Sequence, residues 1–326
     1  MWLIIFNLLF FCSIGNAGML TEEGAILLEK KARTAFGQGK YSESVMIFEQ
    51  IKKELPSFSG NLRVHLFLGL TYRRLGKLNQ AINPLRYYAE ALSHTPEGSR
   101  ALLTLAHTYT DLKKYHEALW AAEEIISSKS RAPEVVQLEA VIVKGRAWLG
   151  LKKVKRSKRA IDSFFIKTKN RSDLKKLKAQ AYLLSMDMTL YRCEKYPKSQ
   201  KRAEIYIREQ IKERGECLLE ALVQYIYAVE QGNPNLLLQG GQRFKSSFQK
   251  YNYLCKSPPK PPGKRTAKQL RQYREEISKI LKTDCDQVRN RGIALLVPWY
   301  LKVPRDFQVY LDQASYALEK GRNHEE

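Results

Sequence analysis

Apolar and small residues recur in the first half of the chain with the spacing of paired, packed helices. In residues 66–92, large apolar positions follow one another at intervals of three and four, which is the period of an amphipathic helix. Gly76 interrupts this pattern, so the stretch is predicted to fold as two antiparallel helices joined by a short turn. The seam between the two helices is predicted to contain Leu68, Gly69, Tyr72, Ala81, Leu85 and Tyr88.

The same pattern returns along the chain at a nearly constant interval. The second helix of each pair is predicted to open at Tyr41, Leu78, Tyr115 and Val154. The first two intervals are 37 positions and the third is 39. A repeated helix-turn-helix with small residues at the crossing points resembles the tetratricopeptide repeat (TPR), whose unit has about 34 residues. Prolines that cannot continue a helix separate the units, at Pro56, Pro96 and Pro133.

The resemblance implies an all-α fold, a right-handed superhelical solenoid of TPR-like helix-turn-helix repeats with a C-terminal helical cap. Residues 18–165 contain four such repeats, and residues 166–255 are predicted to form divergent TPR-like helical pairs. A proline-rich linker follows at residues 256–265, and residues 266–326 form the cap. Such a cap is expected because nothing stacks beyond the last unit of a solenoid. Beyond the clear repeats, periodicity predicts helices over residues 218–229, 236–251 and 266–282.

The first 17 residues have the features of a targeting segment. Residues 2–12 are nearly all apolar, and small residues then occupy the −3 and −1 positions of a cleavage site after Ala17. The apolar run is shorter than the ~20 residues that a helix needs to cross a bilayer. We therefore expect a signal peptide cleaved after Ala17 and export to the periplasm or cell envelope. An uncleaved anchor or an apolar first helix is the alternative.

Export changes the interpretation of the cysteines. Cys12 would leave with the signal peptide, and four cysteines would remain, an even number in an oxidising compartment. Sequence proximity favours pairing Cys193 with Cys217 and Cys255 with Cys285, with four buried free thiols as the alternative. No cysteine or histidine cluster has the spacing of a metal site, so neither a metal nor another cofactor is expected.

Positive charge is concentrated in the C-terminal part of the chain. The net charge is +23, and residues 136–326 carry 40 basic against 20 acidic side chains, whereas residues 18–135 are almost balanced. Such a field attracts acidic proteins, anionic lipid or anionic cell-wall polymer, although a solvated helix face that keeps the protein soluble is an alternative. The densest run, residues 152–178, opens with a candidate basic patch formed by Lys152, Lys153, Lys155, Arg156, Lys158 and Arg159.

Sequence motifs of enzymes are absent. The chain has no GxSxG, GxGxxG, P-loop or HExxH motif, and its five histidines are scattered. The protein is therefore predicted to be non-enzymatic and to act through a binding surface.

In the tetratricopeptide repeat family the first helix of each pair lines a concave groove. The resemblance implies that ligand contacts come from these helices here as well. A guanidinium group can hold a carboxylate with two parallel hydrogen bonds, so a groove rich in arginine suits an acidic protein or peptide, unless the arginines are merely solvated. The candidate groove residues are Arg33, Arg63, Arg73, Arg74, Arg100, His107 and Arg146.

These observations predict a protein-binding scaffold of the cell envelope that captures a partner in a basic concave groove. The alternative is a binder of anionic envelope polymer or membrane surface through residues 152–178. Nucleic acid fits the charge but neither the export signal nor any known nucleic-acid-binding module.

Overall fold

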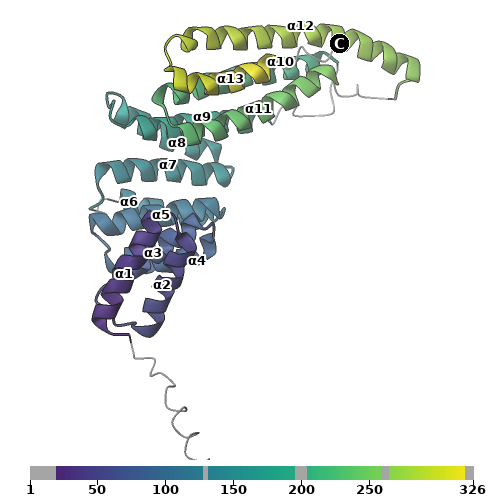
Figure 1. The fold of residues 1–326 in the computed structure, drawn as a ribbon. Helices are drawn as coiled ribbons and strands as arrows, with labels where there is room; N and C mark the ends of the chain where they lie inside the picture. Colours follow the sequence, from purple (N-terminus) through teal and green to yellow (C-terminus); the bar gives the residue numbers. More distant parts are fainter. Residues whose placement is uncertain (1–19, 128–130, 195–203, 258–263, 320–326) are drawn as a thin grey trace, which may run out of the picture. The chain divides into compact units, whose positions relative to one another are not determined.

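The structure is a computed structural model that describes residues 20–127, 131–194, 204–257 and 264–319 (Figure 1). All regular secondary structure in these residues is helical, and the predicted all-α fold of helical repeats is confirmed. The helices are α1 (Glu22–Gly37), α2 (Tyr41–Glu54), α3 (Asn61–Arg74), α4 (Leu78–Ala91), α5 (Pro96–Asp111), α6 (Tyr115–Ile126), α7 (Glu134–Gly150), α8 (Val154–Thr168), α9 (Lys175–Cys193), α10 (Glu204–Gln231), α11 (Pro234–Lys256), α12 (Ala267–Tyr300) and α13 (Arg305–Glu319).

The four turns that join paired helices share one backbone conformation. A single residue in each turn has positive φ: 76° at Gly39, 72° at Gly76, 59° at Lys113 and 61° at Lys152. The N–H of the following residue donates to the carbonyl five positions earlier at 2.8–2.9 Å, the bond of a Schellman motif. Glycine adopts this left-handed conformation without steric cost, whereas lysine does so against the contact between its Cβ and the next carbonyl.

Small residues lie where paired helices cross. A Cβ added to Gly69 on α3 would lie 2.5 Å from Cγ of Leu85 on α4, so only glycine allows this approach. A Cβ added to Gly145 on α7 would lie 3.2 Å from Ile161 on α8, a tight but less severe contact, again 16 positions further along the chain. All six residues predicted for the seam of residues 66–92 are buried. A second small position on the second helix of each pair is fully buried in all four repeats, at Ser44, Ala81, Ala118 and Ser157.

Two compact units divide the chain, Met1–Ala140 and Val141–Glu326, and each is described by itself. In the first unit the helices from α1 to α6 pack in chain order, each against the next. This neighbour-to-neighbour packing is the pattern of stacked helical repeats.

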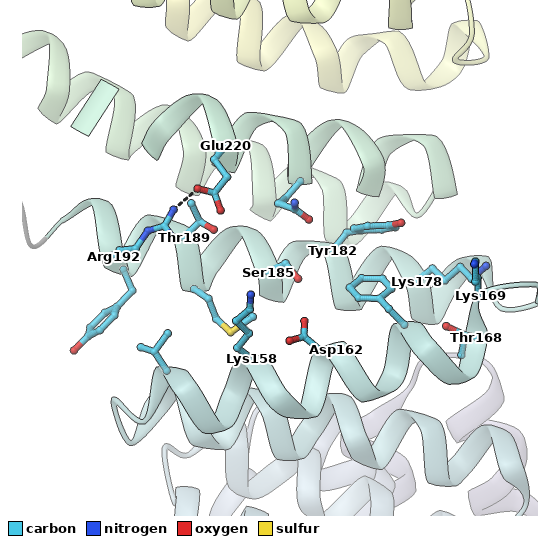
Figure 2. A pocket seen from close by; sticks show the side chains of 15 residues that line it. Lys158, Asp162, Thr168, Lys169, Lys178, Tyr182, Ser185, Thr189, Arg192 and Glu220 are labelled. Carbon is cyan, nitrogen blue, oxygen red and sulfur yellow. Dashed lines mark hydrogen bonds and ion pairs between the residues drawn. The ribbon is translucent and has the colours of Figure 1, made fainter. Parts of the chain in front are cut away.

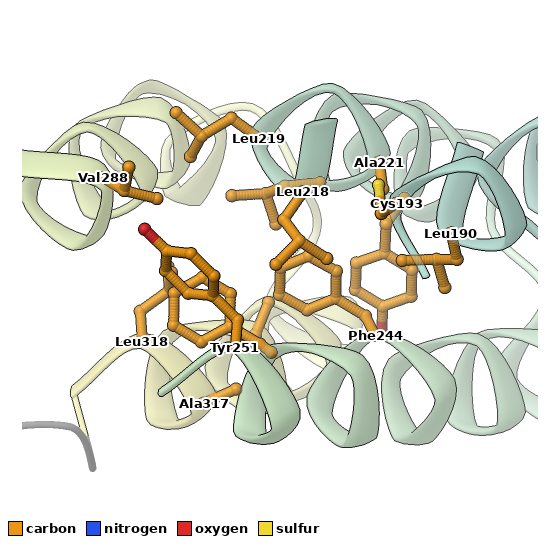
Figure 3. Close-up of a cluster of buried hydrophobic side chains, with 14 of the residues drawn as sticks. Leu190, Cys193, Leu218, Leu219, Ala221, Phe244, Tyr251, Val288, Ala317 and Leu318 are labelled. Atoms are coloured by element: carbon orange, nitrogen blue, oxygen red, sulfur yellow. The ribbon is translucent and has the colours of Figure 1, made fainter. Parts of the chain in front are cut away.

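The second unit contains contacts between helices that are distant in sequence. Helix α10 packs against α9, α11, α12 and α13, and α13 packs against both α11 and α12. One hydrophobic core joins these five helices (Figure 3), and its largest side chains have no exposed surface. The packing of this region therefore differs from a stack in which each repeat contacts its neighbours alone. The fully buried rings are Tyr225, Phe244, Phe248 and Tyr251.

Helix α12 is longer than the sequence predicts. The helix expected over residues 266–282 continues to Tyr300 and has 34 residues. It begins with a capping box between Thr266 and Gln269, which satisfies the first free backbone N–H groups. Its apolar face continues past residue 282 to Val288 and Leu296, which are both buried against the core, so packing sustains the helix to Pro298 in its last turn.

Two disulfides join helices of the second unit. Cys193 on α9 is bonded to Cys217 on α10, with their Cα atoms 5.6 Å apart, and Cys255 on α11 to Cys285 on α12, with a Cα separation of 6.3 Å. Both separations suit a disulfide, and the pairing is the one that sequence proximity favours. All four cysteines are buried in the shared core.

The predicted signal peptide and its cleavage site lie outside the described residues, as do residues 258–263 of the predicted linker. Within the described part of the chain, no helix combines the length and the apolar character needed to cross a bilayer.

The left-handed turns yield a direct stability test. Replacing Gly76 with alanine introduces a Cβ at φ 72°, and we expect this to lower the free energy of unfolding by about 1 kcal/mol. The matched control is Gly37→Ala at the end of α1, where an added Cβ meets nothing within 4 Å and φ is not positive. Urea denaturation of both variants, followed by far-ultraviolet circular dichroism, checks this. Equal midpoints for the two variants would show that the turn carries no such constraint.

The disulfide between α11 and α12 encloses 30 residues, and loop closure on this scale stabilises a fold by about 3–4 kcal/mol. We expect the double variant Cys255→Ser/Cys285→Ser to have a free energy of unfolding that is lower by about 3–4 kcal/mol. Its urea denaturation midpoint should fall accordingly. Wild-type protein denatured without reductant should expose no thiol from the four cysteines of the core. Four reactive thiols in this titration would support the free-thiol alternative instead.

Candidate functional site

The arginines predicted to line a groove on the first helices are held by carboxylates of the chain itself. The side chain of Glu29 on α1 is 4% exposed, and Arg63 on α3 donates to both of its oxygens at 2.9 Å. Arg33 donates a third, longer hydrogen bond to it at 3.4 Å. The Arg63 hydrogen bond, followed by the nearby positive charges, holds the pKa of Glu29 below its ordinary value in spite of burial. This cluster joins α1 to α3.

Two other candidates connect neighbouring repeats in the same manner. Arg73 on α3 donates to Asp111 on α5 at 2.9 Å. His107 on α5 lies 3.0 Å from Glu139, and both side chains are mostly buried. Each of these contacts spans about one repeat in sequence, so a polar pair recurs along the first unit.

The remaining candidates on the first helices are placed differently. Arg100 pairs with Glu97 of its own helix at 3.3 Å. Arg146 on α7 acts on the carboxyl group of Asp187 on α9. Burial raises the pKa of Asp187, and the positive charges of Arg243 and Arg146 oppose this rise. Five of the seven candidates thus have a carboxylate neighbour within 4 Å, and Arg146 lies in the field of another. The seventh, Arg74, is exposed and forms no ion pair within the described ranges.

The basic patch of residues 152–159 differs from these arginines because its cations are not paired with carboxylates in the described residues. Among the residues that the structure describes, its lysines and Arg159 form no ion pair, and all of them are exposed. Arg156 places its guanidinium over the ring of Trp148, 4.6 Å from the centroid, a cation–π contact that leaves the charge in place. Because no carboxylate neutralises them, these charges create a positive field on α8 and the turn before it.

A groove of about 620 Å³ lies beside this patch, between α8, α9 and α10 (Figure 2). Helix α8 contributes residues spaced three or four apart, so a single face of that helix lines the groove. Helix α9 contributes a corresponding face, and α10 adds two residues. The lining comprises Val154, Lys158, Asp162, Phe165, Thr168, Lys169, Lys178, Tyr182, Ser185, Met188, Thr189, Tyr191, Arg192, Glu220 and Gln224.

Cations lie towards both ends of this groove and aromatic rings between them. Figure 2 shows Lys169 and Lys178 at one end and Arg192, which donates to Glu220, at the other. The rings of Phe165 and Tyr182, one from each side of the groove, meet with centroids 4.7 Å apart. Burial raises the pKa of Tyr182. The lysines of such a lining can hold acidic groups, and its rings can contact apolar groups.

Groups of three or more histidine, cysteine, aspartate or glutamate side chains that could hold a metal ion do not occur in the described residues.

The repeated pairs, their common turn and their small crossing residues form a helical-repeat fold, and the predicted resemblance to the tetratricopeptide repeat is confirmed. Residues 37–125 match the model of a family with such repeats, described as "Anaphase-promoting complex, cyclosome, subunit 3". The matched residues include the second helix of the first repeat and the whole of the next two.

Two solved structures are similar to this chain. A tetratricopeptide repeat protein from Parabacteroides merdae ATCC 43184 is 14% identical, with a TM-score of 0.43, covering 78% of this chain and 99% of its own. The structure titled "MamA MSR-1 C2" is 22% identical, with a TM-score of 0.37, covering 50% of this chain and 86% of its own. No curated protein matches the chain. Both TM-scores are below 0.5, so no property is transferred from either structure.

The α9 and α10 sides of the groove were not among the predicted site residues. Beyond residue 170 the repeat pattern weakens, so the sequence alone did not place Tyr182 or Gln224 beside the basic helix. A usable signal was present on α8, where Lys158, Asp162 and Phe165 recur with helical spacing inside the basic run.

The Glu29 cluster predicts a pH-dependent contribution to stability. Because the folded-state pKa lies below the ordinary value of 4.5, the charged carboxylate stabilises the fold above that pH, and the stabilisation is lost as pH falls through the folded-state pKa. Glu29→Gln should therefore cost about 2 kcal/mol at pH 7, and the difference from wild type should shrink on acidification below pH 4.5.

The matched control is Glu23→Gln, which removes one negative charge from an exposed position on the same helix. Urea denaturation of wild type and both variants across the acid range measures the effect. A cost for Glu29→Gln that is equal to that of the control, or constant with pH, would contradict the role of this cluster.

Proposed function

We propose that this chain is an exported, non-enzymatic scaffold of the cell envelope that captures an acidic partner protein or peptide on a basic surface. The helical-repeat fold supports protein binding in general, because stacked helix pairs present extended surfaces to a partner.

The observation that carries the proposal is the contrast between paired and unpaired cations. Arginines of the first helices, such as Arg63 and Arg73, are neutralised at short range by Glu29 and Asp111. The cations of residues 152–159 have no carboxylate within 4 Å among the described residues. A charge that is already paired offers little to a ligand, whereas an unpaired one attracts and orients it. The basic patch and the adjoining groove are therefore the favoured capture surface.

Two features support export. The apolar segment before Ala17 has the pattern of a signal peptide. The disulfides Cys193–Cys217 and Cys255–Cys285 are of the kind that persists in oxidising compartments such as the periplasm.

The second candidate function is binding of anionic envelope polymer or a membrane surface by the same patch. Lys152, Lys153 and Lys155 are exposed together in the turn before α8 and in its first turn, and they carry charge without requiring a shaped pocket. Lysines in this arrangement attract any dense array of phosphate or carboxylate groups.

Charge reversal tests the proposal. Lys155→Glu/Arg159→Glu should weaken capture of the native partner, isolated by crosslinking from the envelope fraction, by about tenfold, since each lost surface ion pair contributes up to about 1 kcal/mol. The control Lys30→Glu/Lys77→Glu makes the same change in net charge at exposed positions of the first unit. Equal capture by the two double variants would contradict a role for α8.

Salt and lipid distinguish the two candidate functions. Binding to anionic vesicles or isolated cell-wall polymer should fall steeply between about 50 and 200 mM salt, because it depends on counterion release. Retention of the protein on these materials, with no protein captured in the crosslinking experiment, would favour the second candidate.

A further inference from the structure

The groove between α8, α9 and α10 has the dimensions of a site for a short peptide segment. Its volume of about 620 Å³ lies within the ~300–1,000 Å³ of pockets that enclose small ligands. All of the residues that line it belong to the second unit.

The spacing between two lysines of the groove sets the length of peptide that can contact both. Lys158 on α8 and Lys169, the residue directly after its end, are 11 residues apart, which corresponds to about 16 Å along the helix axis. An extended peptide advances about 3.3 Å per residue, so its first and sixth residues are separated by the same distance. Neither lysine forms an ion pair within the part of the chain that the structure describes, and each is free to bind a carboxylate of a ligand.

The middle of the groove disfavours negative charge and offers rings to an apolar side chain. Phe165 and Tyr182 form a contact between α8 and α9 there, and both are half-buried. Asp162 lies on the face of α8 between the two lysines and would repel an acidic group placed opposite it. The acidic groups of a ligand are therefore directed towards Lys158 on one side of Asp162 and towards Lys169 and Lys178 on the other, and an aliphatic or aromatic side chain towards the rings.

We infer that this groove binds an extended segment of about six residues of an acidic protein partner, with carboxylates at its first and sixth residues and an apolar side chain between them. The inference rests on the proposed function and specifies its ligand. Lys158 binds one carboxylate, Lys169 with Lys178 binds the other, and the Phe165–Tyr182 contact supports the central side chain.

A synthetic hexapeptide provides the test. The probe carries glutamate at positions one and six, leucine at position three and alanine elsewhere, with blocked termini and a fluorescent label, and its binding is followed by anisotropy. We expect saturable binding to the full-length protein. Moving the second glutamate from position six to position four, where the probe has alanine, keeps the leucine and the net charge. This change should weaken binding by about tenfold, the cost of one ion pair of about 1.4 kcal/mol.

Variants locate the binding. Lys158→Glu and Lys169→Glu should each weaken binding by about tenfold or more. The matched control is Lys167→Glu, an exposed residue of α8 that does not line the groove, and it should change binding by less than about threefold. Ser185→Phe fills the groove without altering charge and should abolish binding, while its unfolding midpoint shows that the protein remains folded.

The failure of this inference can be distinguished from the failure of the proposed function. Absence of peptide binding to wild type, or equal losses in Lys158→Glu and Lys167→Glu with binding intact in Ser185→Phe, would overturn the groove as a peptide site. The proposed function is tested separately through Lys155 and Arg159, which do not line the groove.

Discussion

The close approach of paired helices at small side chains is the interaction on which the rest of the structure depends. At Gly69 the neighbouring helix comes so near that a methyl group would collide with Leu85, and at Gly145 a methyl group would lie tightly against Ile161. Such proximity allows large side chains on either side of the crossing to interlock, and the left-handed turn returns the chain at the angle this packing requires. Because the geometry recurs in each pair, the outward-facing residues of the repeats are free to differ in chemistry.

Charge is distributed over this scaffold in two ways. In the first unit, carboxylates such as Glu29 and Asp111 bind arginines of a neighbouring repeat, so polar side chains connect successive repeats. On α8 the cations have no such partners in the described residues, and the adjoining groove combines lysines with aromatic rings. The first arrangement uses charge within the fold, whereas the second leaves it available to a ligand.

The repeats of the first half were predictable because their signals are local. The turn at Gly76 and the seam positions around Gly69 and Leu85 follow from spacing within a single unit. Lys113 and Lys152 were not recognisable as left-handed residues from their identity, since lysine rarely adopts that conformation. The bond between Glu29 and Arg63 joins residues 34 positions apart, and no short-range pattern encodes it. The full extent of α12 depends on burial of Val288 and Leu296 against other helices, which a linear reading of hydrophobicity does not include.

The disulfides also alter what a break in the backbone would do. Cys193–Cys217 and Cys255–Cys285 each close a covalent ring around the stretch between their two half-cystines. A protease that severed one peptide bond inside either ring would leave the two fragments tethered and seated on the same core. The nicked polypeptide would migrate as a single species until a reductant separated its pieces, so cleavage at these places need not release any part of the molecule.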